Sequence, residues 1–351
     1  MHKTITALLL LIAFALSTNA QLLPKDAVPE KVAEGYKFTE GPALGPDGCI
    51  YFTDIPKSLI LKFDPTKNET TTFRQNTKQT NGLMWHNQNL YMCSHGARAV
   101  RYYMLNERER ATHKRANARD NRVESDEDLF GPRPQNIDFP ISIIDSWSIY
   151  SDDTEIKEVK LNSPNELAID RDGNIYFTDP RYGNRDNMEM KTEGVYYHGD
   201  AHHDNNPNSI YTLTRRIDAE LTRPNGIVFS PDESILYVAD HGANWIYAYD
   251  IESPGKVKNK RKFAQLNGGK GGGSDGMCVD AQGRLYATGH GKVWAFEPTG
   301  QLVATIDVGR QTTNCTFGAD GKTLYITANK GLYRITLNTD APLEHTEKNE
   351  N

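Results

Sequence analysis

Six polar residues recur along the chain, each just before a short apolar segment. All six carry a side-chain oxygen and none is a cation: Glu40, Asn81, Asn165, Asn225, Asp275 and Asn314. Carboxylate and amide oxygens are the ligands that a hard cation such as Ca²⁺ prefers, whereas sulfur and imidazole indicate zinc or copper. Two carboxylates buried together would repel each other unless a cation neutralised them. If folding brings the six residues together, they predict one divalent-cation site.

Asn-Gly and Asp-Gly pairs are also ordinary turn signals, and one copy alone would be explained by a turn. Whichever interpretation holds for Asn225, we expect Gly226 beside it to let the backbone turn sharply. Turn chemistry does not account for Glu40, because Glu is not a favoured turn residue. The segments before Asn81 and Asp275 also do not resemble partner strands. We therefore favour the metal interpretation for the set as a whole.

The segments that follow the six residues repeat one pattern. Each apolar strand leads through a turn to a second strand that carries a tyrosine, and these tyrosines are Tyr51, Tyr91, Tyr176, Tyr237, Tyr286 and Tyr325. Four repeats continue into a third strand, over Leu59 to Asp64, Ile210 to Leu213, Trp245 to Asp250, and Val293 to Glu297. Repetition of this kind is typical of repeat architectures.

The repeats predict an all-β fold, a six-bladed β-propeller. The shortest spacing between successive repeats is about forty residues, the size of one blade of up to four short strands. The strand cores are near-continuous apolar runs, which suits sheets covered on both faces. A pair of β-sandwiches is the alternative, but it does not require one motif six times. The innermost strands of a propeller begin at one mouth of its central channel, so the six polar residues should meet there as the metal site.

Composition restricts the class of partner. The 351 residues have a net charge of −6 that is spread along the chain, which argues against nucleic acids and anionic membranes as partners. Residues 1–20 match a secretory signal: Lys3 precedes an apolar core, and Ser17 to Ala20 end in small residues. We expect cleavage after Ala20 and export to the periplasm or the medium. No later apolar run is long enough to span a membrane, so no membrane contact is expected after cleavage.

Residues 21–351 would then form one propeller domain with insertions at about 107–150 and 184–208. The first insertion begins with a highly charged run, Glu107 to Ser125, which is typical of a solvated helix or loop. In the second, we expect the His202-His203-Asp204 run to face solvent rather than bind a metal. The four cysteines allow three pairings, and we expect buried free thiols instead.

Two further groups of residues recur after the second strands. An aspartate ends the second strand in three repeats, and we interpret these as structural caps: Asp54, Asp179 and Asp240. His241 and His290 follow second strands and are lower-ranked candidates for the site, since a histidine there more often faces solvent. The serine-nucleophile, His-Glu-x-x-His and phosphate-loop motifs are absent from the sequence.

The motifs together resemble the bacterial gluconolactonase branch of the senescence marker protein (regucalcin) family. The matching segments are Thr39-Glu40-Gly41-Pro42, Pro164-Asn165-Glu166, Arg223-Pro224-Asn225-Gly226, Ser274-Asp275-Gly276-Met277 and Thr312-Thr313-Asn314-Cys315. The resemblance implies a lactonase with one divalent cation, often Ca²⁺, at the channel mouth. Its metal-binding Glu, Asn and Asp fall on Glu40, Asn225 and Asp275, and its Asp is also the acid or base. A further site Asn falls on Asn165.

Two positions depart from the family pattern. Glu166 stands where this branch usually has Asp, and Ser163 stands where animal members have a substrate-binding Arg. The departures leave the predicted metal ligands unchanged and concern the substrate.

We expect Glu40, Asn165, Asn225 and Asp275 to hold Ca²⁺, which would polarise the carbonyl of a sugar lactone while Asp275 assists attack by water. The substrate would contact Asn81, Asn165, Arg181, Tyr182 and Asn314. Alternatives are a non-catalytic binding propeller in which calcium is a structural plug, and a calcium-dependent esterase or phosphotriesterase. The oligomeric state is left open.

Overall fold

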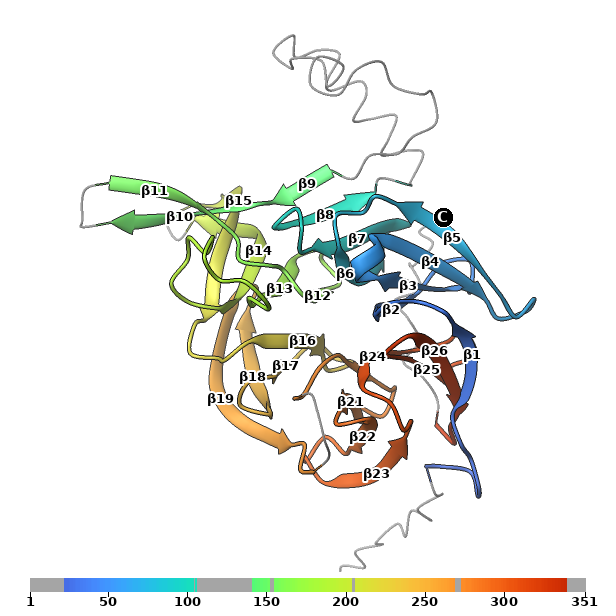
Figure 1. Cartoon of the computed structure of the whole chain (residues 1–351). Helices are drawn as coiled ribbons and strands as arrows, with labels where there is room; N and C mark the ends of the chain where they lie inside the picture. The colour runs from blue at the N-terminus through green and yellow to red at the C-terminus, as the bar shows by residue number, and fades with distance from the viewer. Residues whose placement is uncertain are drawn as a thin grey trace, which may run out of the picture.

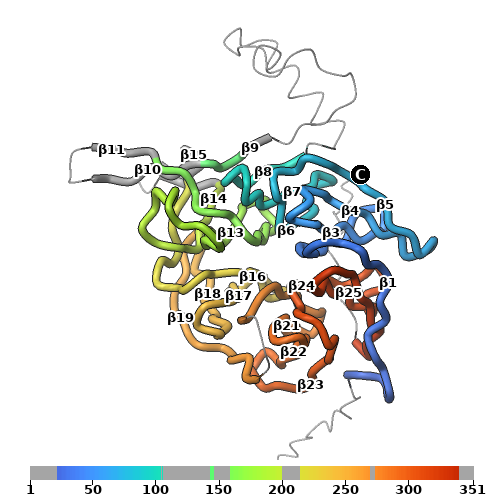
Figure 2. Tube along the Cα trace, viewed as in Figure 1, coloured from blue at the N-terminus to red at the C-terminus, as the bar shows by residue number. Residues whose placement is uncertain are grey.

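The structure, a computed structural model, describes residues 22–103, 105, 141–151, 155–203, 206–268 and 273–339. Six four-stranded antiparallel sheets surround a central axis, with one edge strand of each sheet innermost (Figures 1 and 2). The all-β, six-bladed propeller predicted from the repeats is confirmed. The predictions for residues 1–20 and for Glu107 to Ser125 lie outside the described residues. Within the described part of the chain, no helix could cross a bilayer.

The six blades follow one another along the chain. Blade 1 contains β2 (Thr39–Leu44), β3 (Ile50–Asp54), β4 (Leu59–Asp64) and β5 (Glu69–Gln75), with a short 3₁₀ turn, η1 (Ile55–Lys57), after β3. Blade 2 contains β6 (Thr80–His86), β7 (Asn89–Ser94), β8 (Ala99–Tyr103) and β9 (Ile141–Ile144). Blade 3 contains β12 (Leu167–Ile169), β13 (Ile175–Asp179), β14 (Gly194–His203) and β15 (Asn206–Asp218).

Blade 4 contains β16 (Pro224–Phe229), β17 (Ile235–Asp240), β18 (Trp245–Ser253) and β19 (Lys256–Gln265), and blade 5 contains β20 (Met277–Val279), β21 (Leu285–Gly289), β22 (Lys292–Phe296) and β23 (Leu302–Asp307). Blade 6 combines β24 (Thr312–Phe317), β25 (Thr323–Ala328) and β26 (Gly331–Thr336) with β1 (Glu30–Glu34). A separate hairpin of β10 (Ser146–Ser151) and β11 (Glu155–Lys160) connects blades 2 and 3.

Blade 6 closes the propeller because β1, near the start of the described chain, pairs with β26, near its end. The strand covers an edge that would otherwise present unpaired backbone groups to solvent. The sequence did not reveal this strand, since three of its five residues are charged and no repeat motif accompanies them.

Three sequence predictions for blades 2 and 3 need correction. Ile210 to Leu213 belong to the fourth strand, β15, and the third strand is β14. Much of the predicted insertion at 184–208 is therefore part of the blade, and the extra length lies in the loop of residues 180–193. The predicted insertion at about 107–150 likewise contains β9, the fourth strand of blade 2.

The repeated tyrosines pack between neighbouring blades. The ring of Tyr176 in blade 3 meets Phe229 in blade 4 edge to face, with centroids 5.0 Å apart. The ring of Tyr286 in blade 5 meets Phe317 in blade 6 in the same way at 5.2 Å. Tyrosine suits this position between blades. Its ring can be buried because the second strand is covered on both faces, while the hydroxyl of the tyrosine still needs a hydrogen-bond partner. Tyr286 donates its hydroxyl to Asp280.

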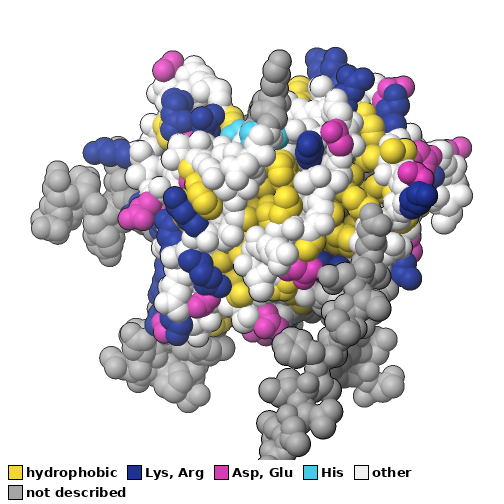
Figure 3. Space-filling model, turned by 90° about the horizontal axis from the view of Figure 1, so that it is seen from below, with side chains coloured by type: hydrophobic (Ala, Val, Ile, Leu, Met, Phe, Trp, Pro, Cys, Tyr) yellow, Lys and Arg dark blue, Asp and Glu magenta, His cyan; other side chains and the backbone are white. Residues whose placement is uncertain are grey.

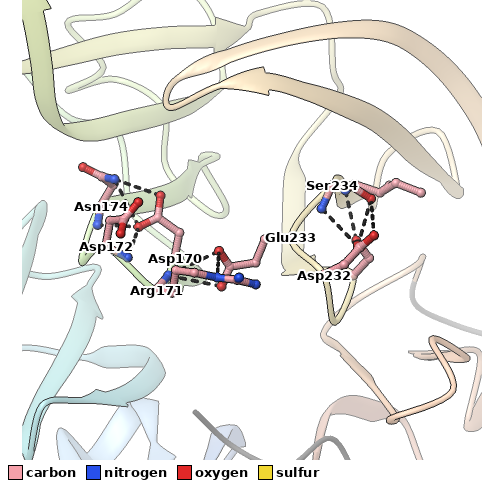
Figure 4. Close-up of polar contacts among 9 residues, drawn as sticks. Asp170, Arg171, Asp172, Asn174, Asp232, Glu233 and Ser234 are labelled. Carbon is pink, nitrogen blue, oxygen red and sulfur yellow. Dashed lines mark hydrogen bonds and ion pairs between the residues drawn. The ribbon is translucent and has the colours of Figure 1, made fainter. Parts of the chain in front are cut away.

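At the far ends of the innermost strands, aspartates organise the turns (Figure 4). Asp170 accepts a hydrogen bond from the backbone of Asn174 at 2.9 Å, and Asp232 accepts one from Ser234 at 3.1 Å. Arg171 of blade 3 pairs with Glu233 of blade 4 at 3.0 Å, so this turn region also links two blades. On the side of the molecule drawn in Figure 3, cationic and acidic side chains are interspersed, as expected for a mildly acidic chain without a patch of one sign.

Candidate metal centre

The six residues singled out from the sequence are all buried, and none is more than 5% exposed. They lie at one end of the innermost strands, around the central channel. Asn165 and Asp275 lie two residues before their strands, which agrees with the prediction that such a residue precedes the strand. The other four are inside strands, at the second or third residue: Glu40, Asn81, Asn225 and Asn314. For these four, the prediction that the residue stands just before the strand is wrong.

The four strands that include a candidate residue each have a break in register at that point. The irregularity lies between Glu40 and Ala43 in β2, and between Pro224 and Ile227 in β16, with equivalents in β6 and β24. Where one strand has an extra residue, a residue at that point loses its ladder partner and its side chain can point in a new direction. Asn81 and Asn225 lie within these bulges, whereas Glu40 and Asn314 keep a ladder partner directly beside the bulge.

Gly226 has a different role from the one expected from sequence. A Cβ atom at this position would lie 2.3 Å from the carbonyl oxygen of Asp275 in the next blade. Its backbone is not in the left-handed region, so a sharp turn is not the reason for glycine. Glycine is required because the neighbouring blade approaches the backbone closely. Gly41 meets both demands, with a φ of +50° and a Cβ position 2.2 Å from the carbonyl oxygen of Asn81.

Hydrogen bonds link every pair of neighbouring blades around the channel. In blade order they run from Thr53 Oγ1 to Asn81 O (3.2 Å), Gly82 N to Asn165 O (2.9 Å), Thr178 Oγ1 to Asn225 O (2.7 Å), Gly226 N to Asp275 O (3.2 Å), Gly276 N to Thr313 O (2.7 Å) and Thr313 Oγ1 to Thr39 O (2.8 Å). The ring fixes the backbone of the candidate residues, including the carbonyl groups of Asn81, Asn165, Asn225 and Asp275. Their side chains are thereby held on a rigid frame.

Three carboxylates interact at this mouth. Burial raises the pKa of Glu40 to about 7. Burial, and then the charge of Glu40, raise the pKa of Glu166 to about 8. The pKa of Asp275 is raised well above its usual range by burial first and then by Glu40 and Glu166. Glu166 is the member that sequence reasoning missed as part of the site, although it directly follows Asn165 and stood out as a departure from the family pattern.

Asn314 is engaged by the protein at both ends of its amide. Its Nδ2 donates to Glu166 Oε2, and its Oδ1 accepts a hydrogen bond from the backbone of Cys315 at 2.8 Å. Asn314 therefore supports the carboxylates in this structure. From its sequence position, Asn314 was expected to contact substrate instead.

The donor set fits a hard divalent cation. Asp275 Oδ1 and Asn81 Oδ1 are buried and have no hydrogen-bond partner within the described residues. A buried oxygen without a partner is costly, and three interacting carboxylates concentrate negative charge. Among the described residues, no three His, Cys, Asp or Glu side chains are grouped to hold a metal by themselves. A site here would thus depend on the amide oxygens as well, as the sequence predicts.

An aromatic wall stands beside these ligands. Asn225 Nδ2 donates to Tyr182 Oη at 2.9 Å, and the Tyr182 ring meets His241 edge to face at 5.5 Å between centroids. Burial, and then Arg223, lower the pKa of His241 below its ordinary value, so its imidazole is neutral at pH 7. Burial, and then Asp275, raise the pKa of Tyr182. His241 thus packs beside the site rather than facing solvent, contrary to the commoner outcome expected for such a histidine.

Arg181 contacts Ser163, the position where animal relatives of the resembled family have a substrate-binding Arg. One guanidinium nitrogen donates to Ser163 Oγ at 3.2 Å and another to Asn187 Oδ1 at 2.8 Å, while Nε is buried without a partner in the described residues. On the other side, Asn81 Nδ2 donates to His95 Nε2 at 3.3 Å. Burial, and then Arg181, lower the pKa of His95 to about 4, so it too is neutral. The signal for His95 was its place after a second strand, shared with His241 and His290.

The three aspartates at the ends of the second strands act as structural caps, as predicted. Asp54 accepts from the backbone of Lys37 and Phe38, and Asp179 accepts from Asn162 and Ser163. Asp240 accepts hydrogen bonds from the backbone of Thr222 and Ala243. They fix the loop that enters each innermost strand.

A cavity of about 240 Å³ lies between blades 3 and 4, at the opposite end of the innermost strands. Its acidic lining includes Asp170, Asp232 and Glu233, whose carboxylates are engaged by the turns and the ion pair described above (Figure 4). We therefore keep the channel mouth, rather than this cavity, as the candidate site.

Comparison with known proteins gives the same family from sequence and from structure. Residues 38–330 match the family model described as the SMP-30/gluconolactonase/LRE-like region. The gluconolactonase of Zymomonas mobilis is 34% identical over 199 residues, which are 52% of each chain. The chain thus spans about half the length of this curated relative. A structure of a gluconolactonase from Xanthomonas campestris is 26% identical, with a TM-score of 0.68 and coverage of 91% of each chain.

A calcium-binding protein, regucalcin, from Agrobacterium tumefaciens shares the fold at 16% identity, with a TM-score of 0.60 and coverage of 90% of this chain and 95% of that one.

Proposed function

The chain belongs to the SMP-30/gluconolactonase/LRE-like family, and from this premise we propose that it hydrolyses a sugar lactone at the channel mouth with the help of one divalent cation, Ca²⁺. The observation that carries the proposal is the buried group of Glu40, Glu166 and Asp275, in which Asp275 Oδ1 has no partner within the described residues. The names of the relatives favour lactones over other esters as substrates.

Glu40, Asn165, Asn225 and Asp275 would hold the cation through carboxylate and amide oxygens. A bound cation would polarise the lactone carbonyl and stabilise negative charge that develops on its oxygen. Asn225 has two partners in this scheme. Its amide oxygen would bind the cation, and its Nδ2 donates to Tyr182 Oη, which fixes the amide plane. The orientation of the remaining amide oxygen is thereby set before any ligand arrives.

Asp275 is the proposed base. Its carboxylate removes a proton from the attacking water as the water oxygen bonds to the carbonyl carbon. The ring C–O bond then breaks, and the proton returns to the alkoxide oxygen, which gives the open hydroxy acid. Burial favours this role because a carboxylate with a raised pKa is a stronger base than an exposed one.

Substrate hydroxyls would meet polar groups around the mouth. Tyr182 accepts from Asn225, so its own hydroxyl proton is free to be donated to a sugar oxygen or to Asp275. Arg181 brings a guanidinium beside Ser163 from a different loop, and its Nε, which has no partner among the described residues, offers a donor. We propose that Arg181 supplies the cationic contact that Ser163 cannot, and that Asn81 and Asn165 offer further amide groups.

The alternatives predict different outcomes in one set of assays. The purified protein is treated with chelator, dialysed, and tested with and without Ca²⁺ on glucono- and arabinonolactones, aryl esters and phosphotriesters, while calorimetry measures Ca²⁺ binding. Lactone hydrolysis that is lost on chelation and restored by Ca²⁺ supports the proposal. Ca²⁺ binding without any hydrolysis would instead indicate a non-catalytic propeller, and preference for aryl esters or phosphotriesters an esterase.

We also propose that the enzyme acts outside the cytoplasm, in the periplasm or the medium. This rests on the signal-like pattern of residues 1–20. Fractionation of producing cells and N-terminal sequencing of the recovered protein would test it, with a new terminus at Gln21 as the expected result.

A further inference from the structure

Two cysteines meet across the boundary between blades 5 and 6. Cys278 lies in β20 and Cys315 in β24, and their sulfur atoms are 3.4 Å apart. Both strands are the innermost strands of their blades. The other two cysteines belong to separate core clusters, Cys93 in one and Cys49 in another. The structure thus singles out one of the pairings that the sequence left open.

From this geometry we infer that Cys278 and Cys315 are a site of oxidative modification, at which a disulfide joins blades 5 and 6 when the protein meets a thiol oxidant such as a small-molecule disulfide. The S–S bond is about 2.05 Å long, so the sulfurs, which are 3.4 Å apart, must approach by about 1.4 Å for the bond to form. All four cysteines are free in the present structure. The inference is independent of the proposed lactonase activity.

The place of this pair in the fold gives the bond a consequence. Asp275 lies three residues before Cys278, and Asn314 directly precedes Cys315. The blades are already linked here by the hydrogen bond from Gly276 N to Thr313 O. A covalent bond would reinforce the same junction and hold the strands of Asp275 and Asn314 together. It would also close a long loop of the chain, which restricts the unfolded state.

With oxidised glutathione as the oxidant, the step is ordinary thiol–disulfide exchange. The sulfur of Cys278, which is the more exposed of the two residues, attacks one glutathione sulfur and releases one glutathione thiol. Cys315 then attacks the Cys278 sulfur and releases the second glutathione. Two protein thiols lose two hydrogens in total, and two molecules of reduced glutathione carry them away. Burial raises the pKa of the Cys278 thiol, so the reaction in the folded protein should be slow at neutral pH.

The test uses the purified full chain, incubated with oxidised glutathione at pH 8.5, quenched with acid, alkylated in denaturant and digested with trypsin. Mass spectrometry should find residues 271–284 linked to residues 311–322, with two alkylated thiols remaining, at Cys49 and Cys93. The oxidised protein should melt on the order of 5 °C higher than the reduced one. Cys278→Ser and Cys315→Ser should each abolish both effects, while Cys49→Ser serves as the matched control and retains them.

Three outcomes would overturn the inference: four alkylated cysteines after oxidation, a linkage that involves Cys49 or Cys93, or glutathione held at Cys278 without exchange to Cys315. The linkage itself is read from peptide masses, so the result does not depend on activity or on a stable variant.

Discussion

Asp275 has two proposed roles, since it is both a ligand of the cation and the base. Asp275→Asn keeps an oxygen for a cation but removes the charge and the capacity to accept a proton. We expect kcat on a lactone to fall by a factor of about 10² or more, while Ca²⁺ binding weakens but persists. Steady-state kinetics and calorimetry on the same preparation separate the two effects. Asp250→Asn, in an outer part of blade 4, is the matched control and should change neither.

Full activity of Asp275→Asn would exclude Asp275 as the base. Loss of all Ca²⁺ binding together with activity would leave its role as a base unproven.

Tyr182→Phe then becomes informative. That variant keeps the ring but removes the hydroxyl that accepts from Asn225. It should raise KM more than it lowers kcat if Tyr182 contacts substrate.

At the scale of the strand, the close approach of blades at Gly226 is a testable constraint. A Cβ in Gly226→Ala would meet the Asp275 carbonyl at 2.3 Å, so the two strands must separate. We expect a loss of 1–3 kcal/mol in the free energy of unfolding and at least a tenfold loss of Ca²⁺ affinity. Gly35→Ala is the control: its φ of +99° makes alanine strained, but nothing lies within 4 Å of the new atom. Its stability should fall while its Ca²⁺ affinity stays.

If Gly226→Ala loses stability without any change in Ca²⁺ affinity, the ring of inter-blade hydrogen bonds does not position the candidate ligands. Denaturant unfolding and calorimetry provide the two measurements.

The repeat pattern predicted the architecture because each blade needs the same parts: a polar residue, an apolar strand, a turn and a strand with a tyrosine that packs between blades. It failed where a strand carries no such signal. β1 carries three charged residues among five and is far in sequence from its partner β26, so only the closed ring explains it. Ile210 to Leu213 were assigned to the wrong strand because the loop of residues 180–193 lengthens blade 3 between β13 and β14.

The candidate ligands could likewise be predicted where the signal lies in the local sequence. Their side-chain chemistry was visible in the sequence, and all six are buried in the structure. Glu166 and His95 could not be assigned to the site in advance, because their roles depend on partners from other blades: Asn314 for Glu166, and Arg181 for the pKa of His95. Such contacts follow from blade packing and leave no local pattern.

For the whole molecule, closure of blade 6 by β1 should determine cooperative stability. Removal of residues 21–35 leaves β26 with an unpaired edge and strips the ion pair between Glu30 and Arg334. We expect the melting temperature to fall by about 10 °C or more relative to the chain that begins at residue 21. Scanning calorimetry would measure it. An unchanged melting temperature would mean that three strands suffice to close the ring.

The charges in the channel also connect the candidate site to global stability. The folded pKa values of Glu40 and Glu166 are about 7 and about 8, against an ordinary value of 4.5. Between about pH 4.5 and 8 the cation-free folded protein therefore binds more protons than the unfolded chain, and its free energy of unfolding falls as pH rises. In chelator, we expect a melting temperature on the order of 5 °C lower at pH 8 than at pH 6.

Calcium should reverse this dependence, because it binds the deprotonated carboxylates and adds about 2.7 kcal/mol at a hundred times its dissociation constant. The rise in melting temperature on adding Ca²⁺ should be larger at pH 8 than at pH 6. Glu166→Gln removes one of the three interacting carboxylates and should flatten the dependence measured in chelator. A melting temperature that stays constant or rises from pH 6 to 8 in chelator would contradict the raised pKa values of Glu40 and Glu166, and with them the reason for a cation at this mouth.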